Sequence, residues 1–380
     1  MERVLMVGLG DLGGNILEIL AREPRAPELI VGDVNEEGGV RTVNNAVLGA
    51  AHHGLHPHFH FRKVDLNDVE WTAQLIKEIN PSAVINCAVM QTWHRIRRLP
   101  PEIYSKLSAA TLGAWLPVQL TLAFKLAQAI QQSGVKTHYI NTSLSDLTNV
   151  VLAKVGLAPT IGIGNVDLIV PAVQTLAANW LRVPRNNVTV YLVAHHVHWV
   201  YPREAGYQKG APYYLKVMLG DKDITKKLDK DRLMYEAVKL YPPGIDFTRV
   251  SASSTIKNLM ALLYDTGLLT HAPGPCGLPG GYPVRLSAKG AEVVLPEELT
   301  LEEAIRINEE AQRYDGVERI EEDGTVVFTD YSVRIMKEML GFDHPQFKPD
   351  ESEVRAREQL SLYLELEKSA LAKVRIGGRD

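Results

Sequence analysis

The stretch that decides the fold is Val4-Leu5-Met6-Val7-Gly8-Leu9-Gly10-Asp11-Leu12-Gly13-Gly14. Four apolar residues run into glycines, and residues 15–20 continue with apolar side chains at helical spacing. This pattern predicts a buried parallel strand, a tight turn and the start of a helix. Gly8 would permit the sharp turn, Gly10 would leave space for a pyrophosphate, and Gly13 would let the helix lie close to the strand. Unpaired N–H groups at the helix start would then bind phosphates.

A second apolar segment, residues 29–32, ends at Asp33, twenty residues after Gly13. An acidic side chain at this place accepts hydrogen bonds from both ribose hydroxyls of an adenosine and repels a 2′-phosphate. The sequence therefore predicts a dinucleotide-binding βαβ unit, with NAD rather than NADP as its cofactor.

Composition narrows the range of functions. The chain has 380 residues, of which 46 % are hydrophobic, enough for two domains with ordinary cores. A formal net charge of −4 gives no reason to expect nucleic acid or an anionic membrane as partner. The two cysteines, Cys87 and Cys276, suggest neither a disulfide framework nor a thiolate metal site. We expect a soluble, cytoplasmic protein, because no signal peptide or membrane-spanning stretch is evident.

The first part of the chain alternates strands with helices, which is typical of a Rossmann-type, doubly wound parallel sheet. We expect this α/β domain to span residues 1–149. Its predicted elements after Asp33 are a helix at 40–51, a strand at 61–65, a helix at 69–78, a strand at 83–89, a long helical region at 103–133 and a strand at 137–141.

Residues 150–380 change in character and predict a mixed α+β domain for substrate binding and catalysis. The expected elements are a strand at 188–194, hairpins at 214–224, 284–295 and 317–328, and helices at 230–240, 253–265, 298–312 and 351–372. The helix at 298–312 should open with a capping box from Thr300 to Glu303. A Gly/Pro-rich loop should occupy residues 273–283.

The residues expected to bind the cofactor lie in the glycine turn and at the carboxyl ends of the parallel strands. They are Gly8, Gly10, Asp11, Leu12, Gly13, Asp33, Asp65, Ala88, Asn141 and Ser143.

A basic segment follows the strand at 83–89, at the edge of the sheet where ligands bind in open α/β folds. Trp93, Arg95, Arg97 and Arg98 predict a lid that contacts the substrate, although a plain basic surface loop would have the same composition. Further upstream, five histidines between residues 52 and 60 flank Pro57 without acidic or cysteine partners. We interpret them as a solvated loop and predict no metal site.

Three later segments, residues 144–148, 161–167 and 192–196, resemble in order and spacing the lactate/malate dehydrogenase superfamily, which includes the family 4 glycoside hydrolases. Residues 281–286, 290–296 and 299–303 look like the closing hairpin and helix of the dehydrogenases. The resemblance runs from residue 2 to about 312. It implies a lactate/malate dehydrogenase-like C-terminal domain and a homo-oligomer, either a dimer or a tetramer.

The resemblance also implies catalytic roles. His196 matches the catalytic histidine of the dehydrogenases, and Asp167 matches the acid that orients it. Hydride transfer from an alcohol needs a base that works near neutral pH, which agrees with this assignment. His195 is the main rival, and His198 is a further candidate. In the hydrolases, the position of His196 belongs to a metal ligand.

Two departures from the superfamily pattern shape the prediction of the substrate. Val170 stands where the dehydrogenases place the arginine that binds the substrate carboxylate, and neither cysteine falls where the hydrolases bind their metal. We therefore predict an NAD-dependent dehydrogenase that acts on the secondary alcohol of a polar small molecule larger than lactate, either a sugar or polyol derivative or an atypical hydroxy acid. Two alternatives stay open: an NAD- and metal-dependent glycoside hydrolase or epimerase, and an NAD-binding redox sensor without turnover.

Overall fold

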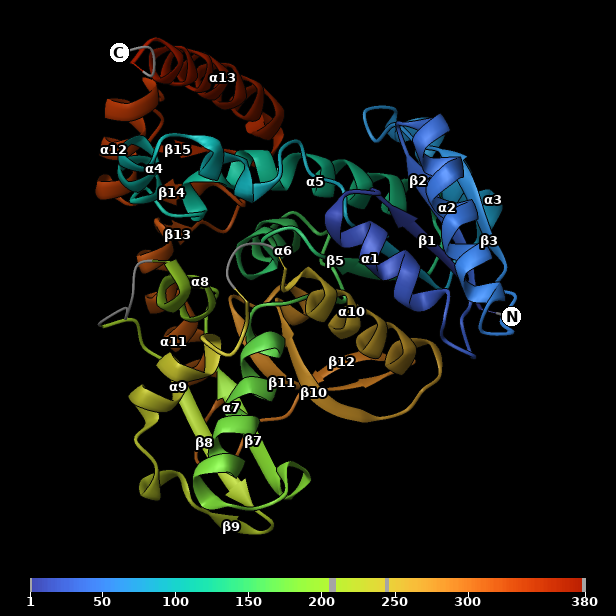
Figure 1. The fold of residues 1–380 in the computed structure, drawn as a ribbon, viewed down its shortest axis with the longest axis vertical. Coiled ribbons are helices and arrows are strands. Elements are labelled where there is room, and N and C mark those ends of the chain that lie inside the picture. The colour runs from blue at the N-terminus through green and yellow to red at the C-terminus, as the bar shows by residue number, and fades with distance from the viewer. Residues whose placement is uncertain (1, 205–209, 243–245, 378–380) are drawn as a thin grey trace.

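A six-stranded parallel sheet forms the first half of the molecule (Figure 1). The computed structural model describes residues 2–204, 210–242 and 246–377. The strands lie in the order β3-β2-β1-β4-β5-β6. Their bounds are β1 Arg3–Val7, β2 Glu28–Asp33, β3 Phe59–Lys63, β4 Ala83–Asn86, β5 His138–Asn141 and β6 Ile161–Gly162. This order, with β1 at the centre, confirms the predicted doubly wound α/β fold.

Both faces of the sheet are covered because its strands are apolar on both sides. Along β1, Val4 and Met6 face one hydrophobic core, whereas Leu5 and Val7 face another. The first core includes side chains of α1 (Asp11–Leu20), α2 (Glu36–Ala51) and α10 (Thr248–Leu263), and the second includes side chains of α3 (Val69–Ile79) and α5 (Leu116–Ser133). The continuous apolar runs that predicted these strands therefore reflect burial from both sides.

The helical region predicted at 103–133 is divided, so this prediction is wrong in its middle. Helix α4 (Pro101–Ser108) ends, η2 (Gly113–Trp115) follows, and α5 begins at Leu116. Thr111 has a φ of 70°, and a Cβ built on Gly113 would lie 2.1 Å from the carbonyl oxygen of Asp315. The break therefore occurs where the chain turns in a left-handed conformation and passes close to a distant segment.

Three small antiparallel sheets make up much of the second half, and the three predicted hairpins are confirmed. Their strands are β7 Val188–Val193, β8 Tyr214–Leu219, β9 Lys222–Asp223, β10 Leu268–Pro273, β11 Gly281–Ser287, β12 Gly290–Val293, β13 Val317–Ile320, β14 Val326–Phe328 and β15 Gln346–Phe347. The remaining α-helices are α6 Ser145–Lys154, α7 Val166–Leu181, α8 Val197–Glu204, α9 Lys230–Val238, α11 Leu301–Gln312, α12 Asp330–Leu340 and α13 Ser352–Gly377. The other short 3₁₀ turns are η1 Trp93–Arg98, η3 Arg185–Asn187, η4 Thr225–Lys227, η5 Pro275–Gly277, η6 Arg313–Asp315 and η7 Pro349–Glu351.

The capping pattern in the sequence correctly predicts the start of one helix. Helix α11 opens with the predicted capping box, in which Thr300 and Glu303 bond each other's main chain. Helices α6, α7, α8 and α12 are not among the predicted elements. Strand β6 pairs with β5, so the parallel sheet continues past residue 149, and the exact domain boundary stays a prediction.

The C-terminal region folds back onto the first half. In Figure 1, α12 lies beside α4, and α13 lies beside α5. Leu107 and Trp115 share a buried apolar cluster with Met336 and Tyr363. In the described part of the chain, no single helix is long and apolar enough to cross a membrane, and the bent pair α4 and η2–α5 meets that test only when taken together.

Candidate active site

The glycine turn has the geometry that its sequence predicted. Gly8 has a φ of 106°, and a Cβ at this position would lie 2.6 Å from the main chain at Ala88. A Cβ on Gly13 would lie 2.0 Å from the carbonyl oxygen of Gly8, so only glycine lets α1 approach β1 this closely. A Cβ on Gly10 would meet nothing within 4 Å. Gly10 is also the N-cap of α1 and makes no side-chain hydrogen bond. No capping side chain therefore occupies the N–H groups of the first turn.

Asp33 ends β2 next to this turn. Its Oδ2 atom accepts the main-chain N–H of Leu9 at 2.8 Å, and its Oδ1 atom accepts that of Asn35 at 2.9 Å. These two bonds fix the carboxylate at the end of the strand, and each oxygen keeps further acceptor capacity.

A cavity of about 1410 Å³ runs from the glycine turn into the second half of the molecule. From the turn it is lined by Gly8, Gly10, Asp11 and Leu12. From the strand ends it is lined by Asp33, Asp65, Ala88 and Ser143. The structure therefore brings eight of the ten predicted cofactor residues to one cavity.

The other two predicted cofactor residues lie behind its wall. Gly13 serves helix packing, as described above. The side-chain amide of Asn141 donates to Asn149 at 2.8 Å and to the carbonyl oxygen of Ser143, while its Oδ1 accepts from Asn86 at 3.0 Å. Asn141 is fully buried in this network and is a structural residue, which corrects its expected contact with the cofactor.

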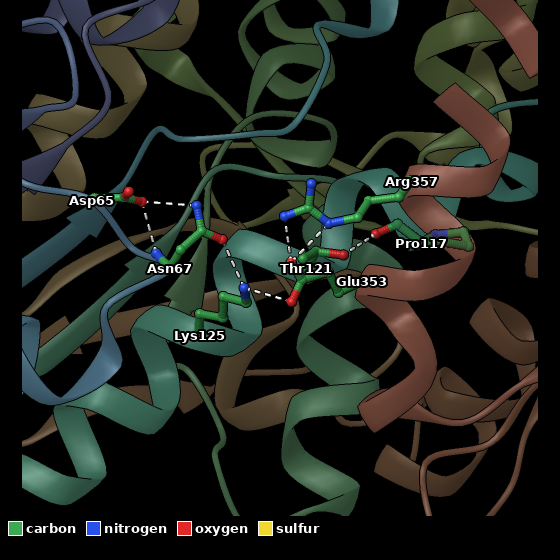
Figure 2. A network of polar contacts seen from close by, with 7 residues as sticks. All are labelled: Asp65, Asn67, Pro117, Thr121, Lys125, Glu353 and Arg357. Carbon is green, nitrogen blue, oxygen red and sulfur yellow. Dashed lines mark hydrogen bonds and ion pairs between the residues drawn. The ribbon is translucent and has the colours of Figure 1, made fainter. Parts of the chain in front are cut away.

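A polar network joins the cavity wall near Asp65 to the C-terminal helix (Figure 2). Asp65 accepts from the main chain and side chain of Asn67, and Asn67 accepts from Lys125 at 2.7 Å. Lys125 also pairs with Glu353 of α13 at 2.7 Å, and Glu353 pairs with Arg357 at 2.6 Å. Because Asp65, Asn67 and Arg357 all line the cavity, α13 forms part of the wall at this end.

His196 also lines the cavity, and two of its contacts come from buried carboxylates. Its main-chain N–H donates to Oδ1 of Asp146 at 2.9 Å. Its ring atom Nδ1 lies 3.3 Å from Oδ2 of Asp315, and both side chains are almost fully buried. The side-chain amide of Asn165 donates to the other oxygen of Asp146. Burial raises the pKa of Asp146 to about 6, while His196 and the Asn165 amide oppose that rise.

The predicted contact between Asp167 and His196 is corrected by this geometry. Asp167 lies in the first turn of α7, and its Oδ1 atom accepts from Lys257 at 2.6 Å and from Thr270 at 3.3 Å. Its Oδ2 atom accepts from Ser254. This carboxylate links α7 to α10 and β10, and Asp315 is the acid beside His196. Sequence reasoning missed Asp315, since nothing local connects η6 with a histidine 119 residues earlier.

The rival histidines point elsewhere. His195 is fully buried, and among the residues that the structure describes neither of its ring nitrogens has a hydrogen-bond partner. Burial lowers the pKa of His195 to about 3, although Asp315 acts in the opposite direction. The Nε2 atom of His198 donates to the carbonyl oxygen of Pro212 at 3.1 Å, and burial lowers its pKa to about 4. Among these three histidines, His196 is the one that lines the cavity.

The basic segment forms η1, and its residues divide into two groups. Trp93 and Arg97 line the cavity, and the guanidinium of Arg97 lies 5.0 Å from the centre of the Trp93 indole. Arg95 instead pairs with Glu367 of α13 at 2.8 Å, and Arg98 is not among the described residues that line the cavity. Glu367 of α13 engages Arg95, so the lining of the cavity gives no support to the expected substrate contacts of Arg95 and Arg98.

The C-terminal region adds cavity residues that the sequence did not suggest. The cavity is also lined by Arg313, Asp315, Thr329, Tyr331 and Ser332. Within the described ranges, no group of three or more His, Cys, Asp or Glu side chains is arranged to hold a metal ion.

The fold is similar to that of solved hydroxy acid dehydrogenases. Lactate dehydrogenase from Cryptosporidium parvum, complexed with lactic acid and NAD, superposes with a TM-score of 0.55 at 15 % identity, covering 83 % of this chain and 98 % of that protein. Malate dehydrogenase from Plasmodium falciparum gives 0.54 at 15 % identity, with the same coverage. Lactate dehydrogenase from Eimeria maxima with NADH and oxamate gives 0.56 at 14 % identity, covering 80 % of this chain and 89 % of that one.

No protein-family model matches the sequence, and no curated protein matches it. The likeness in structure establishes the lactate/malate dehydrogenase fold. The superpositions cover nearly all of the first two dehydrogenases but leave part of this longer chain unmatched.

Proposed function

We propose that this chain is an NAD-dependent dehydrogenase that oxidises a secondary alcohol of a polar small molecule, or reduces the corresponding ketone. The observation that carries the proposal is the pair His196 and Asp315, at the wall of the same cavity that the glycine turn lines. Such a cavity has room for a dinucleotide and a substrate end to end.

The glycine turn and Asp33 fit NAD. Because Gly10 has no Cβ, space is left in the cavity beside the start of α1. Main-chain N–H groups at this helix start can bind a pyrophosphate. Asp33 would accept hydrogen bonds from the adenosine ribose and would repel a 2′-phosphate. Two of the structurally similar dehydrogenases were solved with NAD or NADH, which supports the same cofactor here.

His196 would move the alcohol proton. With Asp315 accepting the proton on Nδ1, the imidazole is held in the tautomer whose Nε2 atom can accept a proton from a hydroxyl. Asp315 would also stabilise the imidazolium that results. A bound NAD would supply the acceptor for the hydride from the carbon that carries this hydroxyl. Asp146, through the main chain of His196, would position the ring.

The substrate should be larger than lactate. Val170, which stands where a carboxylate-binding arginine would be expected, lines a buried core rather than offering a charge. Arg97 and Arg313 supply charges at the cavity instead, together with the hydroxyls of Thr329, Tyr331 and Ser332. This chemistry favours a polyhydroxylated substrate, such as a sugar or polyol derivative, or an atypical hydroxy acid.

A test is to follow NADH formation with a panel of polyols, sugar acids and hydroxy acids, with and without a metal chelator. Net NADH formation that is insensitive to the chelator supports a dehydrogenase. Conversion of a sugar derivative without net NADH would favour the transient oxidation of a hydrolase or epimerase. NADH binding without any conversion would favour a sensor. Size-exclusion chromatography would check the expected dimer or tetramer.

A further inference from the structure

His94 lies beside the start of α1 in the wall of the cavity. It belongs to η1, and its Nε2 atom lies 3.5 Å from Oδ2 of Asp11, the first residue of α1. Both residues line the cavity, and the side chain of His94 is 22 % exposed. Neither the glycine pattern nor the expected lid assigns a role to this histidine. Its ring lies next to the side chain of the residue that follows Gly10.

The segment that carries His94 is held in place from outside the cavity. The next residue, Arg95, pairs with Glu367 at 2.8 Å, and its carbonyl oxygen accepts from the hydroxyl of Tyr363 at 3.0 Å. The preceding residue, Trp93, contacts the His94 ring edge-on at 5.6 Å between centroids. These contacts hold the segment on both sides of His94 in place.

The charges around His94 make it responsive to an anion. Asp11 faces it from α1, and Arg97 and Arg98 face it from its own segment. Burial lowers the pKa of His94, Asp11 raises it, and the two arginines lower it further. The ring is therefore largely neutral near pH 7 in the free protein. Asp11 alone would repel a phosphate at the start of α1, and a protonated His94 would offset that repulsion.

We propose that His94 binds the pyrophosphate of the dinucleotide and takes up a proton from solvent when the dinucleotide binds. This inference rests on the proposed NAD site. The two phosphate charges favour the imidazolium, which becomes a charge-assisted donor to a phosphate oxygen. No covalent bond is made or broken in this step. By linkage, dinucleotide affinity must rise as the pH falls through the range in which the bound histidine titrates.

The test is calorimetric titration of the full-length protein with NADH at several pH values between 6 and 8, in two buffers that differ in ionisation enthalpy. We expect a fractional proton uptake and a Kd several-fold lower at pH 6 than at pH 8, since a rise of one pKa unit on binding limits the gain in affinity to about tenfold. This measurement on the unmodified protein needs no variant to fold.

Variants of His94 test whether this residue takes up the proton. His94→Gln should abolish proton uptake and hold the Kd at its pH 8 value, and His94→Arg should bind tightly at all pH values. The matched control is His53→Gln, an exposed histidine after α2, which should keep the pH dependence. NADH binding without proton uptake, or a pH dependence that survives in His94→Gln, overturns the role of His94 and leaves the NAD site standing. If NADH does not bind at any pH, the proposed function fails first.

Discussion

The Nδ1 atom of His196 lies 3.3 Å from the Oδ2 atom of Asp315, and both side chains are buried at the wall of the same cavity. Asp315 comes from the segment after α11, so the acid beside this histidine is supplied by the C-terminal part of the chain. Asp167, the acid expected from sequence, bonds Lys257 instead. The histidine thus has an acidic partner, but from a different part of the fold.

The glycine turn can be tested with two alanine variants of opposite expectation. A methyl at Gly13 would collide with the carbonyl of Gly8, so Gly13→Ala should destabilise the protein by about 3 kcal/mol or more. Gly10→Ala should fold normally, because a Cβ there meets nothing, but should weaken NADH binding about tenfold or more by occupying phosphate space. Thermal unfolding and NADH titration of both variants check this. Unchanged NADH binding by Gly10→Ala would argue against a dinucleotide at the turn.

Asp33 should set the choice of cofactor. NAD(H) should bind at least about tenfold more tightly than NADP(H), a difference of about 1.4 kcal/mol, because a carboxylate faces the site of the 2′-phosphate. Calorimetry with both dinucleotides measures the ratio. Asp33→Ser should reduce the preference for NAD(H) over NADP(H). Equal affinities in the unmodified protein would show that Asp33 does not face the ribose.

The arginines of η1 should separate into a substrate residue and a structural residue. Arg97→Ala should raise KM or lower kcat, since Arg97 lines the cavity over Trp93. Arg95→Ala should mainly lower Tm, by about 1–3 °C, because it loses the pair with Glu367. Arg98→Ala is the matched control and should change neither. Equal kinetics for all three variants would mean that η1 is a basic surface segment without a substrate role.

Buried histidines should make the protein sensitive to acid. Burial lowers the pKa of His195 to about 3, of His198 to about 4 and of His271 to about 3. Below pH 6.5 the unfolded chain binds protons that the folded chain excludes, so the free energy of unfolding must fall as pH drops from about 6.5 toward 4.

Asp146 acts in the opposite direction, because its raised pKa lets the folded state hold a proton between about pH 4 and 6. The net difference near pH 5 is about two protons, or a slope on the order of 3 kcal/mol per pH unit. Urea unfolding at pH 5, 6 and 7 measures this slope. His271→Gln should reduce it by about one proton, and a flat profile would contradict the burial of these rings.

The fold was predictable where structure follows from short-range pattern. The glycine turn, the apolar strands and the capping box at Thr300 each depend on neighbouring residues, and each appears where it was expected. The break near Thr111 was missed because it depends on the close approach of Gly113 to the distant Asp315.

The site shows the same limit. Strand ends placed Asp33, Ala88 and Ser143 at the cavity, because carboxyl ends of parallel strands share one edge. The positions of the strand ends do not predict which partners the charged side chains bind. The sequence predicts a substrate contact for Arg95, because its partner Glu367 lies far away in the sequence, in α13.

We expect His196 and Asp315 to act together in hydride transfer to NAD. The most direct measurement is the turnover number for NADH formation, on the best substrate of the panel, for His196→Ala, Asp315→Asn, the double variant and Asp167→Asn. The pair should act as a unit, so each single variant should lose about 10²–10⁴-fold in kcat, and the double variant should be little worse than His196→Ala. NADH affinity should barely change, and Asp167→Asn should lower Tm more than kcat. Near-full turnover by Asp315→Asn or His196→Ala would contradict the account.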